Sequence, residues 1–214
     1  MNAIKFESEI IEIINISSSV KHLKISTPED FNFIPGQYIS IILEKDKNKI
    51  RRPYSIASSQ NEKGYVELCI KIIKEGILTP TIAMLKKGDR FEVLGPLGNF
   101  IINNESVNKS IILISTGTGV GPFRSMVKSL LENNFKERII LITGYKNEEE
   151  AIYDSEFKSL AEKYKNFSYY SILSNPKDPD SKKGHVQNLI ESHFSDFPAG
   201  SDYYLCGLKD MINS

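Results

Sequence analysis

The hydrophobic pattern changes its period near residue 103, which divides the chain into two halves. In the first half, short β-branched and apolar runs alternate with turn signals such as Pro35-Gly36 and Gly88-Asp89. Such runs, without long helices between them, predict a small antiparallel β-barrel. The predicted strands cover 10–16, 22–26, 37–43, 65–73 and 90–94, and one short helix is predicted over 79–85.

From about residue 109 the pattern becomes an alternation of strands and helices. The segment 111–114 is continuously apolar, which is typical of a strand buried on both faces. Alternation of this kind predicts βαβ units on a parallel sheet. We therefore expect two domains, a barrel over 1–104 and an α/β domain over 108–214. The predicted strands are 111–114, 138–143, 168–173 and 203–206, and the helices are 123–131, 155–164 and 185–192.

Composition and charge narrow the possible partners. The chain has 214 residues, of which 40% are hydrophobic and 25% charged, as in ordinary globular proteins. Lysine plus arginine and aspartate plus glutamate number 27 each, and this balance argues against nucleic acid as a partner. The N-terminus carries acidic residues, and no apolar run approaches the ~18 residues of a membrane span. We therefore expect a cytoplasmic protein.

The cysteine and histidine residues do not have the number or spacing of a metal or iron–sulfur site. Cys69 and Cys206 lie far apart, and two cysteines are too few for an iron–sulfur cluster held by this chain. The three histidines, His22, His185 and His193, show no metal-site spacing. We expect no metal site.

A glycine-rich turn follows the first strand of the second half. The sequence STGTGVGP over 115–122 joins the predicted strand 111–114 to the next helix. Glycines allow a sharp turn and a close approach of backbone to ligand, and the helix N-terminus attracts a pyrophosphate. The third glycine comes one residue too early for the G-x-G-x-x-G fingerprint, and the next strand does not end in an acidic residue. A purely structural turn remains open, but three glycines in five residues favour a phosphate or nicotinamide site.

The segment 51–58, RRPYSIAS, lies in a predicted strand of the barrel. Taken alone, it fits an edge strand with proline near its start. Its chemistry also fits a flavin. Arginine offers a fork for a pyrophosphate, tyrosine a flat ring beside the isoalloxazine, and serine a hydrogen bond to the reactive flavin nitrogen.

This segment resembles the R-x-Y-[ST] motif of the ferredoxin–NADP reductase superfamily, which includes flavin reductases and the reductase components of oxygenases. The resemblance runs in order along nearly the whole chain. An FAD-binding barrel followed by an NAD(P)-binding α/β domain is the fold that it implies. The other similar segments are PGQY (35–38), 71–89, GPLGNF (95–100), GTGVGP (117–122), 143–157 and the C-G-x-x-x-M segment within 203–211.

The resemblance assigns the flavin contacts residue by residue. Arg52 is expected at the pyrophosphate, Tyr54 at the ring and Ser55 at the reactive nitrogen, with Pro53 between them in the motif. Lys71 is expected near the FAD phosphates, or else is an ordinary solvated strand residue. The other residues expected near those phosphates are Gly76 and Thr79.

The second cofactor is assigned in the same way. The residues Gly117, Thr118 and Gly119 are expected to face the nicotinamide end. Cys206 and Gly207 are expected beside the carbon that carries hydride, although Cys206 also fits a buried, small apolar position. The resemblance makes Ser55 and Cys206 the catalytic candidates.

Two features depart from the family pattern. Ser174 is expected at the nicotinamide dinucleotide, but NADP-preferring members often follow this serine with arginine, and here the next residue is Asn175. The choice between NADH and NADPH stays open. Family members also continue past the C-G-x-x-x-M segment through a helix and a strand, whereas this sequence ends at Ser214, so that we expect the last helix and strand to be missing.

The resemblance implies hydride transfer between NAD(P)H and a bound flavin, for which it favours FAD over FMN. Electrons would then pass to a one-electron carrier, namely ferredoxin, flavodoxin or an oxygenase component. The spacing G-x-L-T-P-x-x-x-x-L-x-x-G-D over 76–89 favours the bacterial ferredoxin–NADP reductases. The alternatives are a reductase of free flavin and a non-catalytic subunit that binds flavin or nucleotide.

Overall fold

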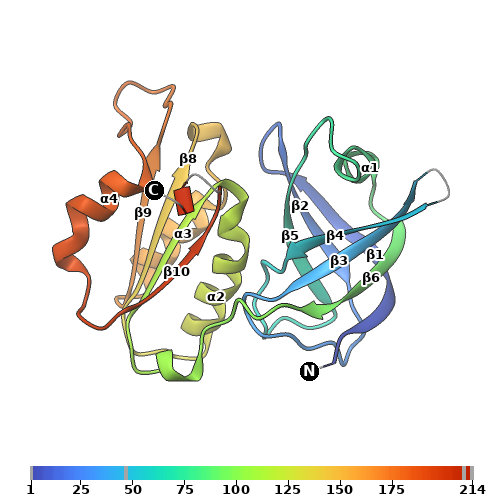
Figure 1. The fold of residues 1–214 in the computed structure, drawn as a ribbon, viewed down its shortest axis with the longest axis horizontal. Coiled ribbons are helices and arrows are strands. Elements are labelled where there is room, and N and C mark those ends of the chain that lie inside the picture. Colours follow the sequence, from blue (N-terminus) through green and yellow to red (C-terminus); the bar gives the residue numbers. More distant parts are fainter. Residues whose placement is uncertain (1, 46–47, 209–210, 213–214) are drawn as a thin grey trace. The chain divides into compact units, whose positions relative to one another are not determined.

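The computed structural model describes residues 2–45, 48–208 and 211–212. The chain forms two compact units (Figure 1). The first unit comprises Met1–Ile102 together with Arg124–Ser129, and the second comprises Asn103–Phe123 and Leu130–Ser214. Among the described residues, no helix has the length and apolar character needed to cross a membrane. Nor do the described His, Cys, Asp and Glu side chains form a group of three or more that is placed to hold a metal ion.

The first unit is a six-stranded sheet in which all neighbours are antiparallel, as the alternating pattern predicted. Its strand order is β4-β3-β6-β1-β2-β5. The sheet curls, and its two edge strands meet at a bridge between Ile56 and Leu68. The strands are β1 (Ile4–Asn15), β2 (Val20–Ser26), β3 (Tyr38–Lys45), β4 (Asn48–Ser55), β5 (Tyr65–Lys71) and β6 (Arg90–Leu97), and helix α1 covers Thr79–Met84.

Alternation along the strands builds the core of this unit. In β5, Val66, Leu68 and Ile70 are fully buried, while the residues between them are partly exposed. Side chains that alternate across a strand place every second residue on the inner face. Ile82 of α1 and Phe31 of a loop complete the same cluster.

Strand β1 begins six residues before the predicted start at residue 10. Its first half, IKFESE, alternates in hydrophobicity but carries charges on the exposed face, and this obscured the strand signal. Those charges pair across to β6, where Arg90 binds Glu7 at 3.2 Å and Glu9 at 2.9 Å. Cross-strand ion pairs of this kind suit an exposed sheet face.

The second unit contains a four-stranded parallel sheet in the order β10-β7-β8-β9, which confirms the predicted α/β architecture. Strand β10 lies on the opposite side of β7 from β8. The chain therefore reverses its direction of progress across the sheet at β7. The strands are β7 (Ile111–Thr116), β8 (Ile139–Tyr145), β9 (Phe167–Leu173) and β10 (Asp202–Cys206), and the helices are α2 (Val120–Glu132), α3 (Asp154–Lys163) and α4 (Val186–His193).

Apolar strands are buried between helices in this sheet. Ile112, Ile140 and Ile172 pack with Val186 and Leu189 of α4 on one face. On the other face, Phe157 of α3 contacts Tyr169, with 5.2 Å between the ring centroids. Helix α2 begins at Val120, three residues before the predicted start, because Gly121 and Pro122 both lie in its first turn, where proline costs no hydrogen bond.

Candidate functional site

The R-P-Y-S segment occupies the end of β4, an edge strand that pairs with β3 along its length. Pro53 has no N–H to donate, and an edge strand tolerates that loss. Arg52 is exposed, and its Nη1 donates to the carbonyl of Arg51 at 2.9 Å. A guanidinium has five N–H donors, so this single bond leaves donors for a phosphate. Ser55 ends the strand and is half-buried.

Tyr54 is anchored more firmly than Arg52. Its ring packs against the barrel core and is half-buried. Burial raises the pKa of the Tyr54 phenol to about 12, and the nearby charge of Arg52 only partly opposes that shift. The phenol is therefore neutral at physiological pH and can donate a hydrogen bond. A fixed ring with a neutral hydroxyl suits a flat cofactor that carries polar substituents.

The predicted phosphate residues lie between β5 and α1. Lys71 is the exposed last residue of β5. The hydroxyl of Thr79 closes the following turn, because it donates to the carbonyl of Ile73 at 2.8 Å and accepts from the Ile73 N–H at 3.1 Å. The N–H of Gly76 donates to the same carbonyl at 2.9 Å. Thr79 thus shapes the turn through its own side chain.

Sheet curling brings the two groups of flavin candidates towards each other. Strands β4 and β5 stand at opposite ends of the strand order, yet the Ile56–Leu68 bridge joins them just beyond Ser55. Closure of the barrel therefore sets the R-P-Y-S strand beside the strand that leads to Lys71. The sequence alone does not indicate that these two strands lie side by side.

In the second unit, two turns meet at the carboxyl ends of β7 and β10. A Cβ added to Gly119 would lie 2.2 Å from the carbonyl oxygen of Cys206, and one added to Gly207 would lie 2.3 Å from Oγ1 of Thr116. The N–H of Leu208 donates to that same Oγ1 at 3.0 Å. The glycine turn and the Cys206-Gly207 turn are thus in backbone contact.

This meeting point lies where the chain reverses direction across the sheet, which is where open α/β sheets bind their ligands. Residues Gly117–Gly119 form a tight 3-10 turn, and Gly117 has a left-handed φ of 55°. Thr118 is half-buried within it. The turn leads directly into α2, and the N–H of Val120 bonds back to the carbonyls of Gly117 and Thr118. The structure thus brings Gly117, Thr118, Gly119, Cys206 and Gly207 together.

Cys206 is half-buried and pairs in register with Ser115 of β7. Burial raises the pKa of the Cys206 thiol, so the side chain is neutral at physiological pH. The Ser115 hydroxyl is fully buried and has no hydrogen-bond partner in the described part of the chain. The sequence analysis assigned Ser115 to the turn 115–122, whereas it lies in β7, directly after four apolar residues.

Ser174 follows β9 at the same edge of the parallel sheet. Its N–H donates to the carbonyl of Tyr145 at 2.9 Å. A hollow of about 200 Å³ lies beside this strand end, and no sequence signal marked it. Glu148 contributes to its wall and ties down the following loop, because its carboxylate accepts bonds from the Lys177 N–H at 2.9 Å and the Ser181 hydroxyl at 2.8 Å. These bonds lower the pKa of Glu148 to about 2.

Two family models match different parts of the chain. The family described as "Oxidoreductase FAD-binding domain" matches residues 7–102, and "Oxidoreductase NAD-binding domain" matches residues 113–214. The chain is 32% identical to "NADH-cytochrome b5 reductase 1" of Dictyostelium discoideum over 98% of its own length and 74% of that protein.

Two further likenesses differ in how much of the other protein they cover. The chain is 31% identical to "Phenol 2-monooxygenase, reductase component DmpP" of Pseudomonas sp., over 98% of the chain, but it spans only 60% of that protein's length. A solved ferredoxin NADP+ reductase from Neisseria gonorrhoeae, with bound FAD and NADP, superposes with a TM-score of 0.84. That likeness covers 98% of this chain and 87% of the other, and at 20% identity it shows the fold alone.

Proposed function

Because this chain belongs to the ferredoxin–NADP reductase superfamily of NAD(P)H-dependent FAD oxidoreductases, we propose that it oxidises NADH or NADPH and passes electrons to a small redox protein. Residues 1–104 would hold FAD, and residues 108–214 would hold the nicotinamide dinucleotide. The observation that carries this proposal is the backbone contact between the Gly119 turn and the Cys206-Gly207 turn. At Gly119 and Gly207 the two turns present backbone atoms at the edge of the parallel sheet where ligands bind.

The donor set in the first unit fits FAD. Arg52 would bind the pyrophosphate through its planar fork, and Tyr54 would lie against the ring with its neutral phenol as a donor. The Ser55 hydroxyl would hold a hydrogen bond at the reactive nitrogen. When bound, FAD supplies the capacity to accept a hydride and to release electrons one at a time.

The second unit would orient the nicotinamide. The glycine turn lets the backbone approach the ring closely, and the partial positive charge at the N-terminus of α2 suits the pyrophosphate. Cys206 would lie beside the ring as a neutral thiol, which neither repels nor protonates the substrate. The chain's contribution is therefore binding, orientation and exclusion of water, with no general acid–base pair required for the hydride step.

The electron acceptor is proposed from the relatives. One is named as the reductase component of a phenol 2-monooxygenase, and another as a cytochrome b5 reductase. Each name links a reductase to a further protein, a monooxygenase in one and cytochrome b5 in the other. We propose a ferredoxin, a flavodoxin or an oxygenase component as the partner of this chain.

Anaerobic mixing of the FAD-loaded protein with NADH, and separately with NADPH, tests the proposal. Loss of the visible flavin absorbance with at least one of them is the expected result. If neither cofactor bleached the flavin, the proposal would fail. Release of FAD on dialysis, combined with turnover of added riboflavin, would instead identify a free-flavin reductase.

A further inference from the structure

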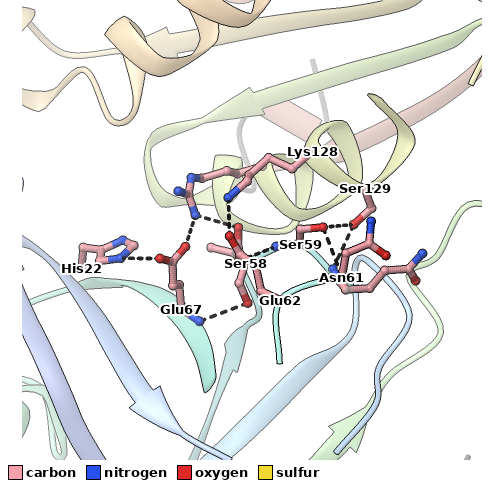
Figure 2. A network of polar contacts seen from close by, with 11 residues as sticks. His22, Ser58, Ser59, Asn61, Glu62, Glu67, Lys128 and Ser129 are labelled. Atoms are coloured by element: carbon pink, nitrogen blue, oxygen red, sulfur yellow. Dashed lines mark hydrogen bonds and ion pairs between the residues drawn. The ribbon is translucent and has the colours of Figure 1, made fainter. Parts of the chain in front are cut away.

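Polar contacts inside the first unit join one face of α2 to the barrel strands (Figure 2). Arg124 and Lys128 are four residues apart and so share that face. Arg124 donates from Nη1 to the carbonyl of Ala57 at 2.9 Å and forms an ion pair with Glu67 of β5. Lys128 forms an ion pair with Glu62 at 2.9 Å. The middle of α2 is therefore held to the barrel by two separate ion pairs.

The Arg124–Glu67 pair is the more deeply buried of the two. The side chains of Arg124 and Glu67 are 9% and 13% exposed. Nε2 of His22, which is 8% exposed, lies 3.6 Å from the other carboxylate oxygen of Glu67. Burial alone would raise the pKa of Glu67, but the neighbouring His22 and Arg124 outweigh it and lower that pKa to about 2. The carboxylate is therefore ionised, and its removal would leave Arg124 as a buried charge without its anion.

The position of this pair along the chain gives it a role beyond packing. Ala57 lies two residues after Ser55 at the end of β4, and Glu67 lies in β5, four residues before Lys71. Arg124 therefore bonds to β5 and to the segment that follows β4, next to the proposed flavin residues. Arg124 also lies in the second turn of α2, the helix that begins directly after Gly117–Gly119. One guanidinium thus joins α2 to two segments of the barrel.

We propose that Arg124 is a positioning residue for hydride transfer, acting through Glu67 and the carbonyl of Ala57. The inference rests on the proposed function. Both bonds leave Nη1, and the planar guanidinium holds their directions fixed, whereas the ammonium group of a lysine is a shorter, freely rotating point charge. Hydride transfer depends steeply on the separation of the reacting atoms, so a small displacement of α2 lowers the rate without abolishing binding.

The test compares Arg124→Lys and Glu67→Gln with the wild-type chain, each loaded with FAD. Stopped-flow mixing with NAD(P)H under anaerobic conditions gives the limiting rate of flavin reduction, the apparent nicotinamide Kd and the charge-transfer absorbance of the complex. We expect a limiting rate lowered by about tenfold or more and a weaker charge-transfer band, with Kd changed by less than about threefold. FAD content per folded chain should be unchanged.

Lys128→Gln is the matched control, because Lys128 lies on the same helix face but its ion pair is with Glu62, in the loop before β5. Its limiting rate should stay within about twofold of wild type. The inference is overturned if Arg124→Lys keeps the wild-type rate, or if Lys128→Gln slows reduction as much as Arg124→Lys does. If Glu67→Gln does not fold, the limiting rate of flavin reduction in Arg124→Lys is sufficient to test the inference.

Different results would overturn the proposed reductase function and the proposed role of Arg124. A wild-type chain that neither nicotinamide reduces would overturn the proposed function and this inference with it. Wild-type reduction with unchanged rates in the variants would overturn this inference alone. A loss of rate that only follows the loss of FAD would show a structural role and would also overturn it.

Discussion

Replacing Gly119 by alanine perturbs the contact between the two turns of the second unit. The added Cβ would lie 2.2 Å from the Cys206 carbonyl oxygen, 2.7 Å from the Cys206 carbonyl carbon and 2.9 Å from the Gly207 Cα. All three are backbone atoms, so no side-chain rotation can relieve the overlap. Ordinary contact begins at 3.4 Å, and the two turns must therefore separate by about 1 Å.

That displacement sets the size of both expected effects. Overpacking of this kind destabilises a fold by about 1–3 kcal/mol. Misplacement of a reacting group by about 1 Å lowers a rate by about 100-fold. We therefore expect Gly119→Ala to keep FAD, which the other unit would hold, but to slow flavin reduction by NAD(P)H by about two orders of magnitude.

Gly200→Ala is the matched control in the same unit. Gly200 has a left-handed φ of 76°, and a Cβ there would meet nothing within 4 Å. Alanine at such a φ costs about 1–2 kcal/mol through backbone strain, which is comparable with the expected cost at Gly119. The two variants should therefore unfold at similar temperatures, while only Gly119→Ala should lose reduction rate.

The assay is anaerobic stopped-flow reduction of the FAD-loaded variants over a range of nicotinamide concentrations, with thermal unfolding measured in parallel. Two results would refute the reasoning. One is a wild-type limiting rate and Kd in Gly119→Ala. The other is an equal loss of rate in Gly200→Ala, which would trace the effect to general destabilisation.

Four further outcomes are expected. Arg52→Ala should weaken FAD binding by about tenfold or more in fluorescence titrations, while Arg51→Ala should not, because side chains alternate across the strand. Thr79→Val should lower the free energy of unfolding in urea by about 1 kcal/mol, because it removes both bonds to Ile73, and Thr79→Ser should restore it. The pKa of Glu67 is depressed from 4.5 to about 2, so its contribution to stability is complete above pH 4.5 and is lost as the pH falls towards 2. Wild type should lose about 2 kcal/mol more than Glu67→Gln across that window in urea unfolding. Cys206→Ala should slow flavin reduction by about tenfold without lowering the melting temperature by more than a few degrees.

The architecture was predictable because it depends on local periodicity. Short apolar runs separated by turn signals in the first half predicted an antiparallel barrel, and strands alternating with helices in the second predicted a parallel sheet. The structure has a curled antiparallel sheet and a parallel sheet. The main error was the start of β1, where charges on the exposed face interrupted the apolar pattern. Local patterns fail where a strand has one face in solvent and that face is paired through charges.

The buried charges were not predictable in the same way. Glu67 lies in β5 and Arg124 in the second turn of α2. From the sequence alone, each charged side chain would be expected to face solvent. Their partnership spans 57 positions of sequence and exists because the fold sets β5 beside one face of α2 in the first unit. Only the tertiary structure identifies Glu67 and Arg124 as partners.

The amino-acid sequence by itself determined the two kinds of sheet, the R-P-Y-S strand and the glycine turn, because each depends on residues close together in the chain. The tertiary structure alone decided that β4 and β5 meet at a closing bridge and that the turns after β7 and β10 touch across 92 positions. Strand order is set by the packing of whole faces against each other, and no short segment contains that information.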